Sequence, residues 1–178
     1  MGPRNCSKLG PAELHTMDLR DAEPADIDAL TRVWYDGWHD AHAQIVPPEL
    51  TRLRTLENFR QRLEDALSDV RVAGPSGAPV GFSMVKEDEL YQLYVSAPSR
   101  GSGLAAALIA DAETRLAERG VTTAWLACAI GNERAARFYE KCGWRRVGTR
   151  LNRLDASAGH LALEVWRYEK FLRPSQRG

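Results

Sequence analysis

Residues Leu90 to Ala105 read LYQLYVSAPSRGSGLA, a pattern that predicts a strand, a short loop with two glycines and then a helix. Because Gly101 and Gly103 lack a Cβ atom, the backbone can turn sharply there and bring several free N–H groups of the helix start against one phosphate or pyrophosphate. Arg100 adds a positive charge beside these groups. The stretch therefore predicts an anion-binding site where the strand meets the helix.

The glycine spacing by itself also fits the dinucleotide-binding pattern G-x-G-x-x-G/A. In that pattern the strand runs almost directly into the first glycine, and the following strand ends in an acidic residue for the ribose. Here residues 96–100 intervene, and the following strand, 121–129, leads into Ile130-Gly131-Asn132 without a carboxylate. A Walker A loop is excluded because no Gly-Lys-Ser/Thr follows the glycines. A dinucleotide-binding oxidoreductase is therefore only a remote alternative.

Two blocks of sequence carry a more specific resemblance. Residues 100–105, RGSGLA, resemble the R/Q-x-x-G-x-G/A acyl-CoA loop of the GCN5-related N-acetyltransferase (GNAT) superfamily, and the strand ending at residues 93–95 precedes the loop as in that family. Residues 132–144, NERAARFYEKCGW, are similar to its N-x-x-A-x-x-F-Y-x-x-x-G-F/W segment. Residues 19–26 also resemble its first strand and turn, so the resemblance spans about residues 17–170. It implies an enzyme that moves an acetyl group from acetyl-CoA to a primary amine by direct attack in a ternary complex.

The resemblance also implies site residues. Those implied to contact acetyl-CoA are Leu93, Tyr94, Val95, Arg100, Gly101, Ser102, Gly103, Leu104, Ala105, Asn132, Ala136, Phe138 and Tyr139. Tyr139 is implied to lie beside the sulfur as general acid, and a phenol with an ordinary pKa near 10 is a suitable proton donor to a thiolate. Glu89 is the candidate general base, because it stands six residues before Val95, where the histone-acetylating branch of the family carries its base. For both side chains a purely structural role stays open: turn surface for Glu89 and packing for Tyr139.

Spacing predicts which of these side chains share a face. On the helix that follows residue 132, the spacing i, i+4 and i+7 predicts one shared face for Asn132, Ala136 and Tyr139. The side chains expected to point toward the core are Ala135, Phe138 and Cys142. On the central strand, period-two alternation places together Glu89, Tyr91, Leu93 and Val95. In the family this strand splays from its neighbour, which implies that a freed N–H near Tyr94 or Val95 can face the thioester oxygen.

The acceptor side is expected on the first helix, where aromatic and imidazole groups gather: Trp34, Tyr35, Trp38, His39 and His42. An aromatic pocket would suit cation–π attraction to an incoming ammonium, although Trp34 and Trp38 also lie on the apolar stripe of the helix. Histidines without a carboxylate at ligand spacing predict no metal site. A small amine, an antibiotic-like polyamine and a peptide or protein amine all stay open as acceptors, and a catalytically silent acyl-CoA-binding module is the alternative to an enzyme.

Composition predicts one cytoplasmic domain. A chain of 178 residues is expected to form a single core, and 24 basic residues against 24 acidic ones provide no positive field for nucleic acid. Three cysteines, Cys6, Cys128 and Cys142, have no metal or redox spacing and are expected to be reduced. No apolar run suits a secretory signal or a membrane span. We expect a disordered tail at 1–16, the domain at 17–172 and a tail at 173–178.

The order of elements predicts an α/β (α+β) single-domain GNAT fold. We expect a mixed, mostly antiparallel sheet of about six or seven strands, with helices on both faces and a splay between the strands at 89–95 and 121–129. The other expected strands are 17–20, 70–73, 80–85, 144–151 and 161–166; the expected helices start after Pro24, cover 56–67, and span 102–119 and 133–141. A homodimer stays open as an alternative, because apolar residues alternate along the strand at Leu161, Leu163 and Val165.

Overall fold

The computed structural model describes residues 18–156 and 159–173. The predicted N-terminal tail, Cys6 and all of the predicted C-terminal tail except residue 173 lie outside the described residues. Within the described ranges no helix combines the length and the apolar character that a membrane crossing requires.

The first half of the chain contributes three strands and three helices. They are β1 Leu19–Asp21, α1 Ile27–His42, α2 Pro48–Leu53, α3 Leu56–Asp65, β2 Val70–Ala73 and β3 Gly81–Lys86. The apolar spacing of the first helix is confirmed, because α1 buries Leu30, Trp34 and Trp38. Helix α1 ends at His42, and Pro48 begins the short helix α2. Proline suits a first helical turn, where its missing N–H would have no partner.

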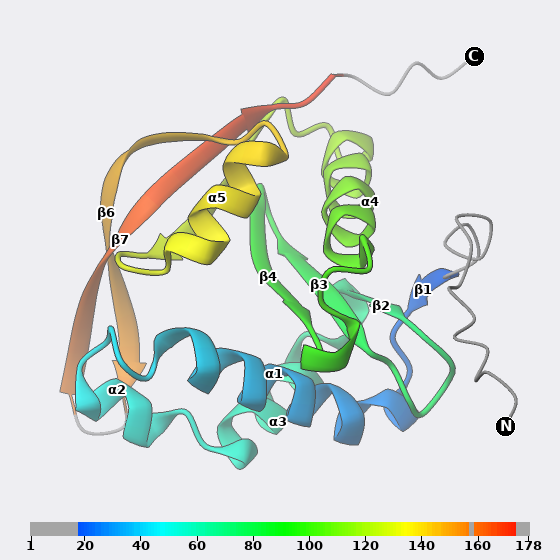
Figure 1. Cartoon of the computed structure of the whole chain (residues 1–178), viewed down its shortest axis with the longest axis horizontal. Coiled ribbons are helices and arrows are strands. Elements are labelled where there is room, and N and C mark those ends of the chain that lie inside the picture. The colour runs from blue at the N-terminus through cyan, green and yellow to red at the C-terminus, as the bar shows by residue number, and fades with distance from the viewer. Residues whose placement is uncertain (1–17, 157–158, 174–178) are drawn as a thin grey trace, which may run out of the picture.

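The second half of the chain completes the sheet. Its elements are β4 Glu89–Val95, α4 Leu104–Glu118, β5 Thr123–Ala129, α5 Glu133–Lys141, β6 Arg145–Ala156 and β7 Gly159–Phe171. Within the described residues the strands form a seven-stranded sheet in the order β1-β2-β3-β4-β5-β7-β6, in which only β4 and β5 pair in parallel. The mixed sheet predicted from the sequence is therefore confirmed. The long β6–β7 hairpin curves away at one side of the molecule, beyond α5 (Figure 1).

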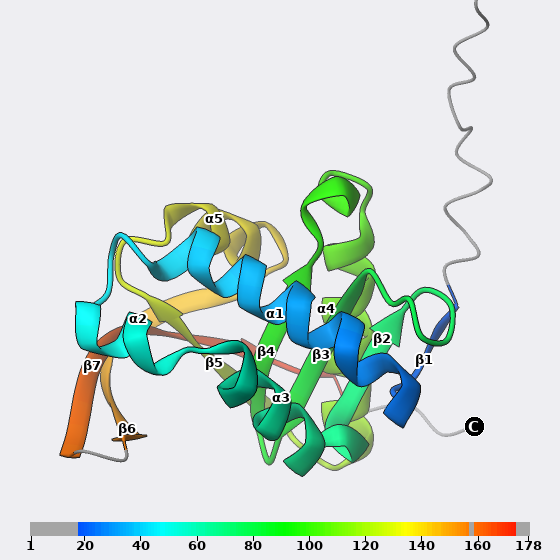
Figure 2. The same ribbon diagram turned by 90° about the horizontal axis from the view of Figure 1, so that it is seen from below.

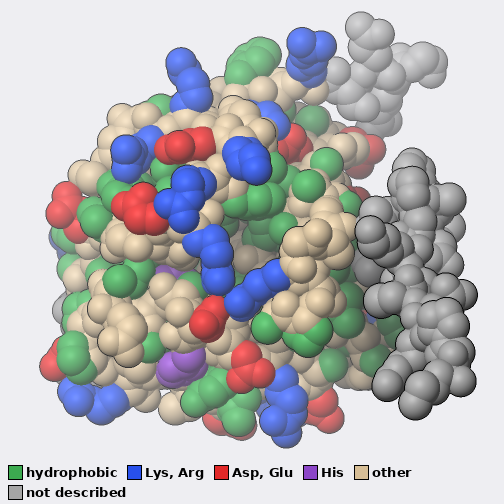
Figure 3. All heavy atoms as spheres, viewed as in Figure 1, with side chains coloured by type: hydrophobic (Ala, Val, Ile, Leu, Met, Phe, Trp, Pro, Cys, Tyr) green, Lys and Arg blue, Asp and Glu red, His purple; other side chains and the backbone are tan. Residues whose placement is uncertain are grey.

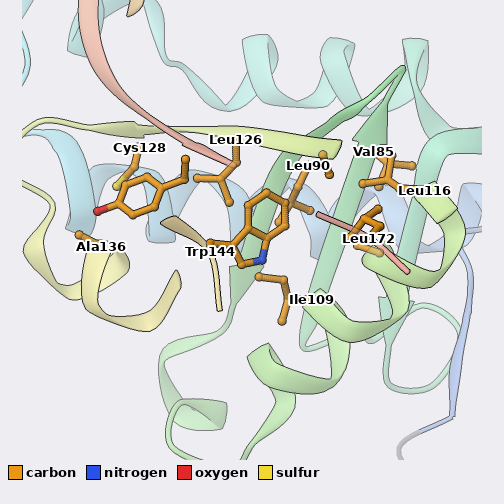
Figure 4. Packing of buried hydrophobic residues seen from close by; sticks show 12 residues of the cluster. Val85, Leu90, Ile109, Leu116, Leu126, Cys128, Ala136, Trp144 and Leu172 are labelled. Carbon is orange, nitrogen blue, oxygen red and sulfur yellow. The ribbon is translucent and has the colours of Figure 1, made fainter. Parts of the chain in front are cut away.

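Helices cover both faces of the sheet. Figure 2 shows α1 and α3 in front of β3 and β4, with α4 behind them. On the α1 and α3 side a core cluster includes Leu30, Trp34, Phe59, Leu63 and Phe82. On the α4 and α5 side the buried cluster drawn in Figure 4 includes Leu90, Ile109, Leu126, Cys128, Ala136 and Trp144. The two clusters fix the helices against the sheet and leave the space between α1 and α5 for a site.

The sheet is split between β4 and β5. The two strands pair at one position only, Glu89 with Trp125. Asp88 closes this end, because its carbonyl oxygen accepts from the Trp125 N–H at 3.1 Å and its carboxylate accepts from Trp125 Nε1 at 2.9 Å. From Leu90 to Val95 the β5-facing edge of β4 has no strand partner among the described residues. The expected splay is therefore present, and it leaves backbone groups of β4 free.

A β-bulge in β4 corrects the expected strand faces. Met84 pairs with Gln92 but Val85 pairs with Leu90, so Tyr91 is left between them without a partner. Such an extra residue reverses the alternation of side chains beyond it. Tyr91 consequently packs with the cluster under α1 and α3, whereas Leu93 packs on the α4 side. The expectation that Tyr91 shares a face with Leu93 and Val95 is wrong for this reason, whereas Leu93 and Val95 do pack on the same side, against Leu104 and Leu108.

A buried ion pair ties β1 to the turn before α1. Arg20 donates from both terminal nitrogens to the Asp26 carboxylate, at 2.7 and 2.8 Å. The N–H groups of Glu23 and Gly77 also donate to Asp26, at 2.8 and 2.9 Å. Chiefly because of the Arg20 hydrogen bonds, the pKa of Asp26 falls from 3.8 to about 2. The Asp26 carboxylate is fully buried, and these hydrogen bonds compensate for the water contacts that it has lost.

Candidate active site

A cavity of about 620 Å³ follows the split in the sheet. Its walls come from α1, α2, α3, β4, β5, α5, the loop before α4 with the first turn of α4, and the β6–β7 hairpin. Figure 3 shows a hollow in the middle of one face, bordered by Lys and Arg side chains. The cavity brings together many of the residues predicted from the sequence: Trp38, His42, Glu89, Leu93, Tyr94, Val95, Arg100, Gly101, Gly103, Ala105, Asn132, Phe138 and Tyr139.

Six predicted site residues lie outside the cavity wall: Ser102, Leu104, Ala136, Trp34, Tyr35 and His39. Leu104, Ala136 and Trp34 are buried in the core, and Figure 4 shows Ala136 beside Cys128 in the packed cluster. Tyr35 packs against His39 and Phe59. The helix faces of α5 therefore differ from the expectation, because Ala135 and Phe138 face the cavity and Ala136 faces the core.

The glycine loop has the geometry of an anion cradle. Gly101 and Gly103 have φ angles of +77° and +85°, which a residue with a side chain rarely adopts. No described atom lies within 4 Å of a Cβ built on either glycine, so both face open space. The backbone N–H groups from Gly101 to Ala106 donate no hydrogen bond within the described part of the chain. Six free donors at the start of a 15-residue helix fit a phosphate or pyrophosphate.

Asp40 holds two arginines at the entrance of this loop. Its carboxylate accepts from Arg100 at 3.0 Å and from Arg134 at 3.2 Å, which joins α1 to the loop and to α5. The hydrogen bonds from Arg134 and then Arg100 lower the pKa of Asp40. Both arginines line the cavity, so two cations stand beside the free N–H groups.

Glu89 lies at the closed end of the split. Burial raises the pKa of its carboxyl from 4.5 to about 7, although the positive charges of Arg150, Lys86 and Arg167 oppose the shift. A carboxylate that titrates near neutral pH accepts a proton readily and still exists in its ionised form under physiological conditions. The site therefore contains a group with the properties of a general base.

Tyr139 supplies a phenol to the same cavity. Burial raises the pKa of its hydroxyl far above the usual range, so the group is protonated at every physiological pH. Its ring packs on Phe138 and Tyr168, at centroid distances of 5.6 and 6.1 Å. The hydroxyl makes no hydrogen bond with another described residue. A fixed ring with a free O–H can donate a proton to a ligand in the cavity.

Sequence reasoning missed part of the cavity wall. Residues outside the two motif blocks that line it are Arg54, Arg62, Gln92, Cys128, Asn152, Leu154, Leu163 and Val165, and Arg134 lines it from a variable position of the second block. Arg62 also occupies the aromatic surface that was expected to receive the ammonium, because its guanidinium lies 4.4 Å from the centre of the Trp34 ring. One signal existed in the sequence: Arg62 follows Phe59 by three residues, so a charged side chain lies on the apolar stripe of α3. His42, in the same wall, stacks on Trp38 at 5.1 Å, and burial lowers its pKa so that the ring is uncharged at neutral pH.

The split sheet and the glycine cradle are features that the resemblance to the N-acetyltransferase class of enzymes led us to expect. The acetyltransferase (GNAT) family profile matches residues 28–144, and the chain belongs to this family. An uncharacterized N-acetyltransferase of Mycobacterium tuberculosis (strain H37Rv) is 35% identical over 103 residues, which cover 55% of this chain and 66% of the mycobacterial protein. The match thus spans just under two thirds of that relative. An uncharacterized N-acetyltransferase of Archaeoglobus fulgidus is 30% identical over 142 residues, 73% of this chain and 94% of its own length.

Solved structures share the fold. A GCN5-related N-acetyltransferase of Rhodopseudomonas palustris matches with a TM-score of 0.68 at 23% identity, covering 88% of this chain and 96% of that one. YncA of Salmonella typhimurium, solved with its cofactor acetyl-CoA, matches with a TM-score of 0.65 at 16% identity, over 92% of this chain and 98% of that one. Within the described residues no group of three or more His, Cys, Asp and Glu side chains is placed to hold a metal ion.

Proposed function

We propose that the protein is an acetyl-CoA-dependent N-acetyltransferase that acetylates a primary amine by direct attack in a ternary complex. The observation that carries the proposal is the cavity itself: one continuous space contains the glycine cradle, the free edge of β4, Glu89 and Tyr139. The membership of the chain in the GNAT family supports the same reaction class.

The donor would be held by backbone groups. The N–H groups of residues 101–106, with Arg100 and Arg134, suit the pyrophosphate of a coenzyme A ester. The unpaired edge of β4 can bond an extended pantetheine arm in the way a peptide adds to the edge of a sheet. A free N–H near Tyr94 or Val95 can then stabilise the oxyanion that develops on the thioester carbonyl, worth roughly 3 kcal/mol for one well-aimed donor.

Two side chains would move the protons. Glu89, with a pKa of about 7, removes a proton from the incoming ammonium, directly or through a water, so that the neutral amine can attack the carbonyl carbon. As the carbon–sulfur bond breaks, Tyr139 donates its proton to the departing thiolate, and the second proton that the nitrogen loses on becoming an amide restores the phenol through solvent. The phenol is suited to this step because burial keeps it in the neutral form until negative charge develops beside it.

The experiment that tests the proposal follows release of free CoA from acetyl-CoA with a panel of primary amines. In Tyr139→Phe the ring stays and only the hydroxyl is lost, so we expect turnover to fall by roughly 10- to 1,000-fold with acetyl-CoA affinity nearly unchanged. The loss should shrink with an acyl donor whose thiol has a low pKa, because that thiolate needs less protonation. Tyr35→Phe is the matched control, since Tyr35 lies on α1 outside the cavity wall.

Each alternative predicts a different result. A silent acyl-CoA-binding module would bind acetyl-CoA by calorimetry but release no CoA with any amine. An oxidoreductase would be stabilised against heat by NADH or NADPH and not by acetyl-CoA. If Tyr139→Phe is fully active with both donors, Tyr139 only packs and solvent protonates the thiolate.

A further inference from the structure

Two arginines at one end of the cavity lack acidic partners. The Arg54 guanidinium donates to the Asn58 side-chain oxygen at 3.1 Å, and the Arg62 guanidinium donates to the Tyr91 hydroxyl at 2.9 Å. Both of these partners are neutral. The ion pairs formed among the described residues involve other arginines and leave Arg54 and Arg62 out. Two adjacent positive charges in a cavity wall are therefore not neutralised by the protein.

This arrangement carries an energetic cost. Burial, followed by repulsion from Arg62, lowers the pKa of Arg54 from 12.5 to about 10. Glu89 lines the same cavity, but the cations that act on its carboxyl are Arg150, Lys86 and Arg167. A partly buried cation without a counter-charge is retained against this cost when a ligand supplies the missing anion.

Both guanidinium groups are held in place before any ligand binds. The central carbon of the Arg62 guanidinium lies over aromatic surface, 4.4 Å from the Trp34 ring centre and 5.7 Å from that of Phe59. Arg54 follows α2, where its backbone N–H bonds to Leu50 and Thr51 and its carbonyl accepts from His39 Nε2 at 2.8 Å. Planar groups fixed in this way are suited to a carboxylate or phosphate.

The position of the pair separates it from the donor site. In Figure 2 the helix α3, which bears Arg62, and the loop that leads into α4 lie on opposite sides of α1. The anion cradle for the pyrophosphate is in that loop, so the arginine pair is not needed to hold it. Glu89 opens β4, whereas the cradle follows the other end of that strand. The pair therefore belongs to the acceptor end of the cavity.

We propose that Arg54 and Arg62 bind an anionic group of the acceptor, so that the substrate is a primary amine that also carries a carboxylate or a phosphate. The proposal rests on the acetyltransferase function proposed above and narrows its substrate class. An acceptor of this kind places its anion on the arginines and its amine toward Glu89. Polyamines and lysine-rich peptides are disfavoured, because their additional positive charges would meet the two guanidinium groups.

Matched amines test the proposal. With acetyl-CoA and the full chain, CoA release is measured for ω-amino carboxylates of three to five carbons and for their carboxamides, which differ in charge but little in shape. A second arm compares O-phosphoethanolamine with ethanolamine and distinguishes phosphate from carboxylate. We expect kcat/KM to favour the anionic member in at least one arm by about ten- to a hundredfold, as for hydrogen bonds to charged groups.

The variant Arg54→Gln should remove most of this preference for the anionic member of each pair. Its control is Arg52→Gln, because Arg52 is an exposed residue of α2 that pairs with Glu49 outside the cavity. Arg62→Gln is the second variant and should act in the same direction. Equal kcat/KM for anionic and neutral members, or a preference that survives both substitutions, would overturn the proposal.

A binding measurement separates this proposal from the one on which it rests. If no amine in the panel releases CoA, the proposed catalytic function fails, and the arginine site is then tested by calorimetry with N-acetyl-4-aminobutyrate and its carboxamide. Binding of the carboxylate alone, lost in Arg54→Gln and kept in Arg52→Gln, supports an anion site. Equal binding of the two compounds, or no binding of the carboxylate, overturns it.

Discussion

Replacement of Glu89 by glutamine should make the protein more stable and less active at the same time. The carboxyl has a pKa of about 7 in the folded protein against an ordinary value of 4.5, chiefly because of burial. Since the folded pKa is the higher one, the free energy of unfolding falls as the pH rises from about 4.5 to about 7 and then stays low. At about 1.4 kcal/mol for each pH unit, the difference corresponds to roughly 3 kcal/mol.

Glu89→Gln removes this charge and keeps the shape. At pH 8 we expect the variant to exceed the parent in stability by up to about 3 kcal/mol, or roughly 5–10 °C in Tm for a chain of this size. At pH 4.5 the two proteins should melt together, because Glu89 is then protonated in the folded state. Thermal melts followed by circular dichroism from pH 4.5 to 8 measure the difference.

The same substitution should lower turnover, whereas it raises stability. Turnover of Glu89→Gln at pH 8 should be lower by roughly 100-fold, the usual contribution of a general base. The ratio of parent to variant activity should fall about tenfold per pH unit below pH 7, where the base becomes protonated. Because parent and variant are compared with the same amine at each pH, the ionisation of the amine affects both rates equally and cancels in the ratio.

Glu87→Gln is the control, because Glu87 is an exposed carboxylate of the preceding turn. It should leave both the melting profile and the rate nearly unchanged. The reasoning is refuted if Glu89→Gln is no more stable than the parent at pH 8, since burial would then not be the cause of the raised pKa. A stabilised variant with full turnover would instead transfer the role of base to another group or to a water chain.

Three further perturbations test other parts of the structure. Gly103→Ala should weaken acetyl-CoA binding at least tenfold by calorimetry, whereas Gly120→Ala, with a φ of +86° and equally open space at the other end of α4, should cost similar stability without changing affinity. Asp40→Asn should tighten acetyl-CoA binding by about two- to fivefold at low salt, because it frees the two arginines at the entrance for phosphate, and the gain should fade at high salt. Asp26→Asn should lower the free energy of unfolding by about 3 kcal/mol at pH 7, as measured by urea titration. The difference between parent and variant should narrow as the pH falls from about 4 toward about 2, because the parent carboxylate then becomes protonated.

The parts of the fold that were predicted from sequence are those that local signals specify. The bounds of α5 were predicted correctly because Asn132 caps its first turn, accepting from the Ala135 N–H at 3.3 Å. The hairpin of β6 and β7 was predicted too short, since β6 is an edge strand whose residues 145–151 are exposed and show no apolar alternation. The bulge at Tyr91 carries no glycine or proline to mark it. Its presence depends on pairing with a neighbouring strand, which a local pattern does not contain.

The residues of the candidate site also fall into two groups, those that a local motif indicates and those that only packing brings to the cavity. The cradle glycines and Tyr139 stand in contiguous motifs, so the sequence alone indicated them. Arg54 and Arg62 come from the segment after α2 and from α3, and they join the cavity only because these elements pack across α1. Tertiary packing, and not spacing along the chain, decides which side chains face the acceptor.

The single pairing of Glu89 with Trp125 gives the sheet a weak seam. The two parts of the sheet on either side of it, β1 to β4 and β5 to β7, can open as separate cooperative units. A ligand whose backbone-like arm bonds to the free edge of β4 takes the place of the missing strand contacts and couples these units. We therefore expect acetyl-CoA to slow amide hydrogen exchange on both sides of the seam, in β5 and α5 as well as in β4. We expect limited proteolysis of the protein to be correspondingly slower with acetyl-CoA than without it.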